Sequence, residues 1–453
     1  MEILWAEQAL LADGWARDVR IVIDDTGRIA SVTADSPAEG ARHAVLLPAP
    51  ANLHSHAFQR AMAGLTERRG PDPRDTFWTW RQLMFRFLDR LTPEDVEAIT
   101  AFVQMEMLEA GYACNVEFHY LHHRPGGLPH DNLAEMSARI AAAAQTTGIG
   151  LTLLPVLYQY GGCDQRALGA GQIRFGNDPD RFARLHDGAR AAIAALPRDT
   201  VLGVAPHSLR AVSPDALRDV IALGDGPIHM HLAEQVAEVD EVSAAWGARP
   251  VRWLLANAAV DARWCLIHCT QMLPDETLGL AATGAVAGLC PITESSLGDG
   301  IFDGVRWLGA GGRFGIGSDS NIRIALSEEL RTLEYSQRLR DLSRAALARP
   351  DASTGRVLFE GAARGGAQAA GRAAGAIAPG LWADLMALDG AAVDLIDKTG
   401  DTILDAWIFA GDDRMVLDVW AAGRHVVRDG RHIARDAIRA RYVETLRRLK
   451  DAL

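Results

Sequence analysis

The sequence lacks the features that would assign it to a membrane, secreted or disulfide-rich class. It has no run of about 18 or more uncharged apolar residues, so we expect no transmembrane helix. The N-terminal segment Met1–Gln8 carries two acidic residues and no basic region, so we expect no signal peptide. The five cysteines are scattered and form no C-x-x-C pair, which favours reduced thiols in a cytoplasmic protein over a disulfide framework.

The chain also lacks an excess of basic residues. Its 46 Lys and Arg stand against 58 Asp and Glu, which gives a formal net charge of −12. A nucleic-acid-binding protein generally needs a basic surface, so we expect no nucleic-acid partner. Apolar residues make up 49% of the 453 positions, enough for a large core. This length suits one large barrel-type domain with a smaller domain beside it.

The middle of the chain contains apolar runs that alternate with helical patterns. One helix is clearly marked: Thr92 can cap it, Pro93 takes the first helical position, and Gly111 follows its end. Eight strand candidates separated by helical stretches predict an α/β fold, a (β/α)8 TIM barrel with a parallel sheet. The candidates are residues 44–50, before His54, and residues 113–119, 151–157, 201–206, 228–232, 265–269, 285–290 and 314–318.

The two ends of the chain are rich in strands instead. Residues 19–29 are predicted to form a hairpin with its turn at Asp25-Thr26-Gly27, and residues 384–389 and 416–427 are predicted strands. Chain termini often lie close together in space. We therefore expect one composite β domain from residues 1–47 and 376–453. A catalytic barrel domain would then span residues 48–375.

Polar residues close several of the apolar runs. His54 and His56 end the first strand, and as residues i and i+2 of an extended segment they can point to the same side. His231, His268 and Asp319 end the fifth, sixth and eighth strands. Active sites of TIM barrels lie at these strand ends, and imidazole is a good ligand for zinc and its neighbours. An isolated H-x-H is weak evidence, but five such residues at equivalent positions predict a metal-dependent site.

These residues resemble the metal-dependent amidohydrolase superfamily, in its deaminase branch. The resemblance rests on the segments His54-Ser55-His56, His231-Leu232-Ala233-Glu234, His268 and Ser318-Asp319. It implies a (β/α)8 barrel beside a β-sandwich made from both termini. It also implies one divalent ion per chain, usually Zn²⁺, held by His54, His56, His231 and Asp319. We find no strand-end lysine that would bridge two metals, so a mononuclear site is expected.

The resemblance implies a hydrolytic deamination. A metal ion lowers the pKa of its bound water to about 7, and the resulting hydroxide would attack an amidine or C=N carbon. Asp319 would be both a ligand and a proton acceptor, while His268 would orient the hydroxide and stabilise the developing charge. Glu234 would move a proton to the substrate nitrogen, so that the leaving group departs as ammonia.

Further stretches resemble one family of this branch, the formimidoylglutamate deiminases. They are residues 52–64, 77–81, 117–123 and 206–212. This family hydrolyses N-formimino-L-glutamate to N-formyl-L-glutamate and ammonia in histidine degradation. Its substrate carries two carboxylates, and a planar guanidinium binds a carboxylate through two hydrogen bonds. Arg81 and Arg210 are therefore candidate carboxylate ligands, and Gln59, Tyr120 and His207 are further candidate substrate-binding residues.

Two alternatives stay open. The chain could be a deaminase or dechlorinase of a heteroaromatic ring of the guanine or triazine type, although a neutral ring does not need two guanidiniums. It could also be a catalytically silent barrel that acts as a binding or assembly protein, although its ligand and acid–base set is complete. The expected partner is a small dicarboxylate substrate, with no membrane contact, and the family suggests a homodimer. Trp78 and Trp80 could line the site or serve packing.

Overall fold

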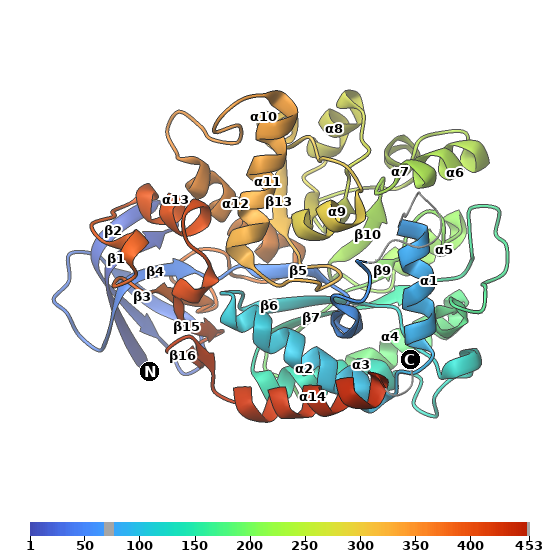
Figure 1. The fold of residues 1–453 in the computed structure, drawn as a ribbon, viewed down its shortest axis with the longest axis horizontal. Helices are drawn as coiled ribbons and strands as arrows, with labels where there is room; N and C mark the ends of the chain where they lie inside the picture. The colour runs from blue at the N-terminus through green and yellow to red at the C-terminus, as the bar shows by residue number, and fades with distance from the viewer. Residues whose placement is uncertain (68–76, 451–453) are drawn as a thin grey trace.

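The computed structural model of the chain describes residues 1–67 and 77–450. Parallel strands occupy seven of the eight positions predicted for the middle of the chain, and the fourth is divided into two short pieces (Figure 1). The first prediction is wrong: most of the run 44–50 belongs to a strand of the terminal sheet, and the first parallel strand begins after it, at Ala51. Most residues of these strands are buried, which explains why they are continuous apolar runs rather than alternating ones. The strands are β5 (Ala51–Ser55), β6 (Cys114–His119), β7 (Gly150–Leu157), β8 (Val201–Leu202), β9 (Ala205–Pro206), β10 (Ile228–Leu232), β11 (Trp264–His268), β12 (Val286–Leu289) and β13 (Arg313–Ile316).

These strands form two parallel sheets. One has the order β5-β6-β7-β8, with β9 also paired to β7, and the other has the order β10-β11-β12-β13. Single parallel bridges connect the two sheets, from Val204 to Ile228 and from Ser55 to Asp319. The predicted parallel α/β class is therefore confirmed.

Helices pack outside the parallel strands (Figure 1). The predicted helix after Thr92 is present as α2 (Pro93–Glu109), and Thr92 and Asp95 cap it reciprocally. The remaining helices of this region are α1 (Phe77–Leu88), α3 (Glu135–Thr147), α4 (Pro179–Ile193), α5 (Pro214–Ile221), α6 (Val236–Trp246), α7 (Pro250–Asn257), α8 (Pro274–Ala281), α9 (Pro291–Leu297), α10 (Gly304–Gly309), α11 (Leu326–Asp341) and α12 (Thr354–Ala369). Short 3-10 helices include η1 (Ala57–Met62) and η3 (Ile173–Phe175). None of the helices in the described part of the chain combines the length and apolarity needed to cross a membrane.

Strands from both chain ends share one further sheet. Its order is β17-β16-β15-β14-β4-β1-β2-β3, and it is a single continuous sheet rather than the two sheets of the predicted sandwich. The reason is that β4 pairs with β1 on one side and with β14 on the other. The strands are β1 (Glu2–Leu11), β2 (Gly14–Ile23), β3 (Ile29–Thr33), β4 (Ala41–Pro48), β14 (Leu385–Leu388), β15 (Val416–Ala421), β16 (Arg424–Arg428) and β17 (Arg431–His432). A separate apolar core, which includes Leu4, Ile21 and Trp420, packs on this sheet.

The C-terminal segment also contains helices that the strand pattern did not predict. They are α13 (Asp401–Phe409) and α14 (Arg435–Lys450). Helix α14 runs beside α2 (Figure 1), and its Ile438 joins Ala101, Met105 and Ala143 in a buried cluster. The end of the chain thus packs on helices outside the parallel strands rather than on the terminal sheet.

Candidate active site

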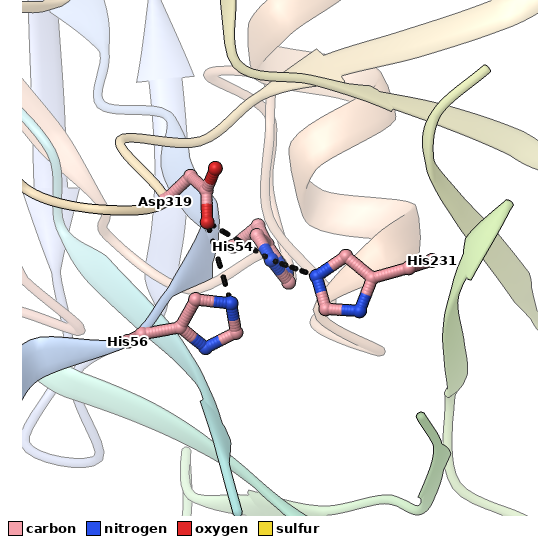
Figure 2. Close-up of side chains that lie close together, drawn as sticks. All are labelled: His54, His56, His231 and Asp319. Carbon is pink, nitrogen blue, oxygen red and sulfur yellow. Dashed lines mark hydrogen bonds and ion pairs between the residues drawn. The ribbon is translucent and has the colours of Figure 1, made fainter. Parts of the chain in front are cut away.

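Three histidines and one aspartate converge at the carboxyl ends of the parallel strands (Figure 2). The Nε2 atoms of His54 and His231 lie 3.1 Å apart. Asp319 Oδ1 lies 3.5 Å from His54 Nε2 and 3.3 Å from His56 Nε2. All four residues are buried, and one donor atom from each lies within 4.8 Å of the others. Nitrogen and oxygen donors grouped in this way could hold a metal ion.

The backbone next to these residues is unusually constrained. Asp319 has a φ of 46°, in the left-handed region that residues other than glycine rarely adopt. Its N–H donates to the His54 carbonyl, and the His56 N–H donates to the Asp319 carbonyl, both at 2.9 Å. Gly317 allows this approach, because a Cβ atom there would lie 2.7 Å from the His54 nitrogen. Strain of this kind clusters at functional sites.

Backbone carbonyls fix the tautomers of two histidines. His56 Nδ1 lies 2.8 Å from the Phe118 oxygen, and His231 Nδ1 lies 3.1 Å from the His207 oxygen. A carbonyl only accepts, so in each ring Nδ1 carries the proton and Nε2 presents a lone pair to the cluster. Burial lowers the pKa of His54 to about 3 and also lowers the pKa of His56 and His231. Neutral imidazoles are the form that metal binding requires.

The carboxylate of Asp319 completes a donor set that suits a divalent cation. Burial alone would raise the pKa of Asp319, but its hydrogen bond with His54 and the nearby His268 hold that pKa well below its usual value. Asp319 is therefore an anion beside inward-facing nitrogen lone pairs. These residues fit the metal that the sequence predicts.

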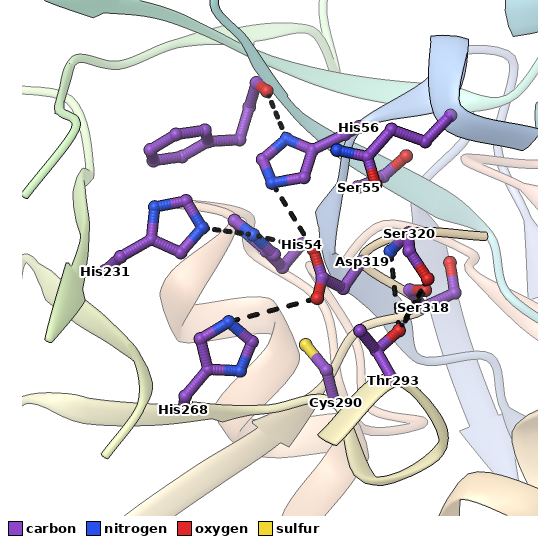
Figure 3. Close-up of polar contacts among 12 residues, drawn as sticks. His54, Ser55, His56, His231, His268, Cys290, Thr293, Ser318, Asp319 and Ser320 are labelled. Atoms are coloured by element: carbon purple, nitrogen blue, oxygen red, sulfur yellow. Dashed lines mark hydrogen bonds and ion pairs between the residues drawn. The ribbon is translucent and has the colours of Figure 1, made fainter. Parts of the chain in front are cut away.

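An acid–base group lies directly beside these donors (Figure 3). His268 Nε2 is 3.8 Å from Glu234 Oε1 and 3.9 Å from Asp319 Oδ2, and His268 Nδ1 is 3.2 Å from Glu294 Oε1. Burial alone would lower the pKa of His268, but the Glu234, Glu294 and Asp319 carboxylates raise it well above its usual value. Burial also raises the pKa of Glu234. Both groups are placed and tuned to exchange protons with a bound molecule.

The site opens into a cavity with about 540 Å³ of space, part of which is open to solvent. Its wall contains all of the predicted substrate-binding residues. Gln59 Nε2 donates to the Tyr120 hydroxyl at 2.8 Å, and Arg81 Nη2 donates to the Tyr158 hydroxyl at 2.5 Å. The lining residues are His56, Gln59, Trp80, Arg81, Met84, Tyr120, Tyr158, Phe175, His207, Arg210, His231, Glu234, His268, Leu297, Asp319 and Ser320.

Two guanidiniums therefore face the cavity that contains the candidate metal donors. The Arg210 residue is only 6% exposed. Burial would lower the pKa of its guanidinium, but Glu238 and Glu234 raise it, so Arg210 remains a buried cation. Arg81 approaches from α1 on another part of the wall. Such a pair suits a ligand with more than one anionic group.

Some lining residues were not predicted. Tyr158 directly follows β7, so the strand-end rule that identified His231 would also have identified it. Met84, Phe175 and Leu297 are apolar residues of helices, and their sequence carries no chemical signal for a site. Of the tryptophan pair, Trp80 lines the cavity, whereas the side chain of Trp78 lies outside the described part of the structure.

Comparison with known proteins identifies the family. Residues 45–426 match the model described as "Amidohydrolase family". The chain belongs to the amidohydrolase family. Within it, the chain groups with the formimidoylglutamate deiminases, because residues 1–44 match the model described as "Formimidoylglutamate deiminase HutF, N-terminal domain". It is also 49% identical, over 100% of both chains, to a formimidoylglutamate deiminase of Pseudomonas aeruginosa.

Two other proteins are also similar to this chain. An 8-oxoguanine deaminase of Pseudomonas aeruginosa is 30% identical over 77% of this chain and 74% of its own length. A crystal structure described as an amidohydrolase from Brucella melitensis has 49% identity and a TM-score of 0.95, covering 99% of this chain and 100% of that one. The predicted class, a hydrolase acting on carbon–nitrogen bonds, is confirmed.

Proposed function

We propose that this protein is a zinc-dependent formimidoylglutamate deiminase. It would convert N-formimino-L-glutamate and water to N-formyl-L-glutamate and ammonia. The observation that carries the proposal is the 49% identity, over the full length of both chains, with the Pseudomonas aeruginosa formimidoylglutamate deiminase. The buried cation of Arg210 and the guanidinium of Arg81 support it, because they face one cavity with the candidate metal donors. A neutral heteroaromatic ring would not need both.

The ligands in this proposal are His54, His56, His231 and Asp319, holding one zinc ion per chain. Support comes from three neutral imidazoles and one carboxylate whose donor atoms lie within 4.8 Å of each other. Zinc favours such nitrogen and oxygen donors. When bound, the ion would supply Lewis-acid chemistry and lower the pKa of a coordinated water to about 7.

Proton transfer is assigned to Glu234 and His268. Glu234 would take one proton from the attacking water and deliver it to the formimino nitrogen. Asp319 would accept the second proton of that water, which must also reach the nitrogen so that the carbonyl forms and ammonia leaves as a neutral molecule. The raised pKa of Glu234 favours its role, because a carboxyl group that titrates closer to neutrality can both accept and return a proton. His268 would stabilise the negative charge that develops on the atoms bonded to the attacked carbon. Asp319 would accept a proton in addition to binding the metal.

Substrate selection is assigned to the cavity wall. Arg81 and Arg210 would bind the two carboxylates, which leaves the formimino group free to reach the strand ends. Gln59, Tyr120 and His207 would supply further hydrogen bonds from the same wall. The buried Gln59 Oε1 has no hydrogen-bond partner among the described residues, so it can accept a bond from the substrate.

The architecture that goes with this function is a closed (β/α)8 barrel of residues 48–375 beside a domain of residues 1–47 and 376–453. The two bridges between the parallel sheets support closure. A homodimer in the cytoplasm, acting in histidine degradation, is the setting we propose by analogy with the family. Light scattering of the purified protein would test the dimer.

The function can be tested by an ammonia-release assay on the zinc-loaded protein with formimino-glutamate, formimino-aspartate and guanine. We expect a clear preference for formimino-glutamate, about one zinc per chain by metal analysis, and loss of activity after chelation that zinc restores. A preference for guanine would overturn the substrate assignment. Full activity in metal-free protein would overturn the metal assignment.

A further inference from the structure

A chain of buried side-chain hydrogen bonds runs alongside the candidate metal ligands, from β5 to β6. Asn52 Nδ2 donates to Ser318 Oγ at 2.7 Å, and Ser318 Oγ donates to Asn321 Oδ1 at 2.6 Å. Asn321 Nδ2 donates to Ser55 Oγ at 3.1 Å, and Ser55 pairs in register with Glu117 of β6, where its side chain acts to lower the pKa of the Glu117 carboxyl. Each of these five residues is at most 2% exposed. None belongs to the proposed ligand or substrate-binding sets.

Every hydrogen bond in this chain points the same way. Ser318 accepts the bond from Asn52 and donates to Asn321, and Asn321 in turn donates to Ser55. Glu117 Oε1 also accepts from the Ala57 N–H at 2.7 Å, and Oε2 accepts from Asn115 Nδ2 at 3.2 Å. Hydrogen bonds aligned in this way polarise and strengthen one another.

The chain contacts the backbone on both sides of the proposed ligands. Glu117 holds the N–H of Ala57, the residue after His56. Asn321 Nδ2 also donates to the carbonyl of Asp319 at 3.1 Å. Ser318 N–H, just before Asp319, donates to Asn52 Oδ1 at 3.1 Å. Ser55 and Ser318 lie next to the ligand residues in Figure 3.

We propose that Asn52, Ser55, Glu117, Ser318 and Asn321, here named the polar clasp, are positioning residues that set how tightly the metal ion is retained. This inference rests on the proposed function, because it takes His54, His56, His231 and Asp319 as the ligands. His54 and His56 come from the first parallel strand, whereas Asp319 follows the last. Only a single bridge, from Ser55 to Asp319, pairs the backbones of these two segments there.

The polar clasp adds side-chain hydrogen bonds between these two segments, whose backbones are paired there by that one bridge. It also holds Asp319 and Asn321, whose φ values of 46° and 54° are strained, in the conformation that aims the Asp319 carboxylate at the histidines. Residues that hydrogen-bond to metal ligands and so orient them typically change metal affinity by about 10–100-fold when they are replaced.

The key variant is Glu117→Gln. A glutamine can accept from the Ala57 N–H with its oxygen, but its NH₂ group then replaces the oxygen that accepts from Asn115. Asn115 must therefore turn its amide to present Oδ1, which has no partner among the described residues. The double variant Asn115→Asp with Glu117→Gln places an acceptor at residue 115 without that rotation and keeps one carboxyl group in the pair. Thr147→Val is the matched control, since it removes an equally buried side-chain bond, to Gln104 on α2 at 3.0 Å, away from the ligands.

Two measurements on each zinc-loaded protein test the proposal: the rate of zinc transfer to a chromogenic chelator and, after chelation, the urea midpoint of the metal-free chain. We expect zinc release to be about 10–100-fold faster in Glu117→Gln, close to wild type in the double variant, and unchanged in Thr147→Val. The urea midpoints of Glu117→Gln and Thr147→Val should fall by similar amounts. Ser55→Ala, which removes the acceptor of the Asn321 bond and leaves the Glu117–Asn115 contact in place, should also release zinc faster. It provides the test if Glu117→Gln does not fold.

The outcomes separate this proposal from the one on which it rests. A wild-type protein that takes up no zinc would overturn the metal assignment and the polar clasp together. A wild-type protein that retains zinc, with release unchanged in the clasp variants, would overturn the polar clasp alone. Faster release in Thr147→Val as well would also overturn it, because the effect would then be one of general stability.

Discussion

The buried guanidinium of Arg372 joins the parallel strands to the terminal sheet, and its replacement should destabilise the whole chain. Arg372 Nη2 donates to both carboxylate oxygens of Asp384 at 3.0 Å, and Nη1 donates to Asp199 Oδ2 at 3.1 Å. Arg424 of β16 donates twice to Asp199 at 2.8 Å. The Arg372 side chain is 1% exposed and both aspartates are 2% exposed, so solvent screens these charges little.

The size of the effect follows from what each carboxylate retains. In Arg372→Met, Asp199 keeps Arg424, whereas Asp384 loses its guanidinium and keeps the Ala422 N–H at 2.7 Å. Removing one partner of a buried ion pair typically costs about 3–5 kcal/mol, because the other charge is left uncompensated. We expect a loss of this size in the free energy of unfolding near pH 8. The double variant Arg372→Met with Asp384→Asn should lose less, because the uncompensated charge is gone.

The pH dependence gives a second check. Burial already raises the pKa of Asp384, and Arg372 opposes that rise. Without Arg372, the pKa of Asp384 in the folded protein should lie further above its unfolded value. A carboxyl group shifted in this direction binds a proton on folding, so the variant is relatively stable at low pH and loses stability as pH rises through the folded pKa. The deficit relative to wild type should therefore be smaller near pH 5 than near pH 8.

Urea unfolding at the two pH values measures both effects. Arg414→Met is the control, because the Arg414 side chain is 91% exposed in its pair with Asp412 and should leave the midpoint unchanged. A deficit below about 1 kcal/mol near pH 8, the range of exposed pairs, would refute the reasoning. A deficit that does not depend on pH would refute the assignment of the effect to Asp384.

Three further predictions concern the site and a buried histidine. Glu234→Gln should reduce ammonia release by about 10²–10⁴-fold while metal analysis finds the zinc content unchanged; turnover near wild type would remove Glu234 from proton transfer. Arg210→Ala should raise KM about 10–100-fold with a smaller change in kcat, since it removes a charged hydrogen bond to substrate. Steady-state kinetics with an unchanged kcat/KM would exclude Arg210 from carboxylate binding. Burial lowers the pKa of His119 from 6.5 to about 3, so its contribution to stability is complete above about pH 6.5 and is lost as pH falls towards 3. In His119→Gln, the free energy of unfolding should fall less steeply as pH decreases over that range, and the difference in slope should correspond to about one bound proton. Equal slopes for the variant and the wild type, measured by urea unfolding at each pH, would contradict this.

The positions of the site residues were predictable because the parallel fold has a rule for them. Strand ends meet at one edge of the sheet, so His231, His268 and Asp319 could be grouped before any coordinates were available. The same rule could have found Tyr158, which follows β7. It could not have found Glu294, because that residue lies within α9 and reaches His268 only through the packing of α9 against the strand ends.

Other features depend on pairings between distant segments. The polar clasp joins Asn52 to Ser318 and Ser55 to Asn321, each pair 266 residues apart, and each of these residues alone has no distinctive sequence pattern. The continuous terminal sheet likewise depends on β4 pairing with β14 as well as β1. Alternation predicts which residues form strands, but it does not fix which strands become neighbours.

In the proposed function, the metal ligands and the carboxylate-binding residues come from different parts of the fold. The proposed ligands lie at strand ends whose backbones are bonded to each other, as in the two 2.9 Å bonds between Asp319 and the His54–His56 segment. Arg81 lies on α1, whereas Arg210 lies in the segment after β9, and neither belongs to the metal donor group. Loops and helices can change without moving strand ends, because the strands form a separately packed core. Substitutions at Arg81 and Arg210 should therefore alter which substrate is bound while the zinc content stays the same, whereas substitutions in the polar clasp should do the reverse.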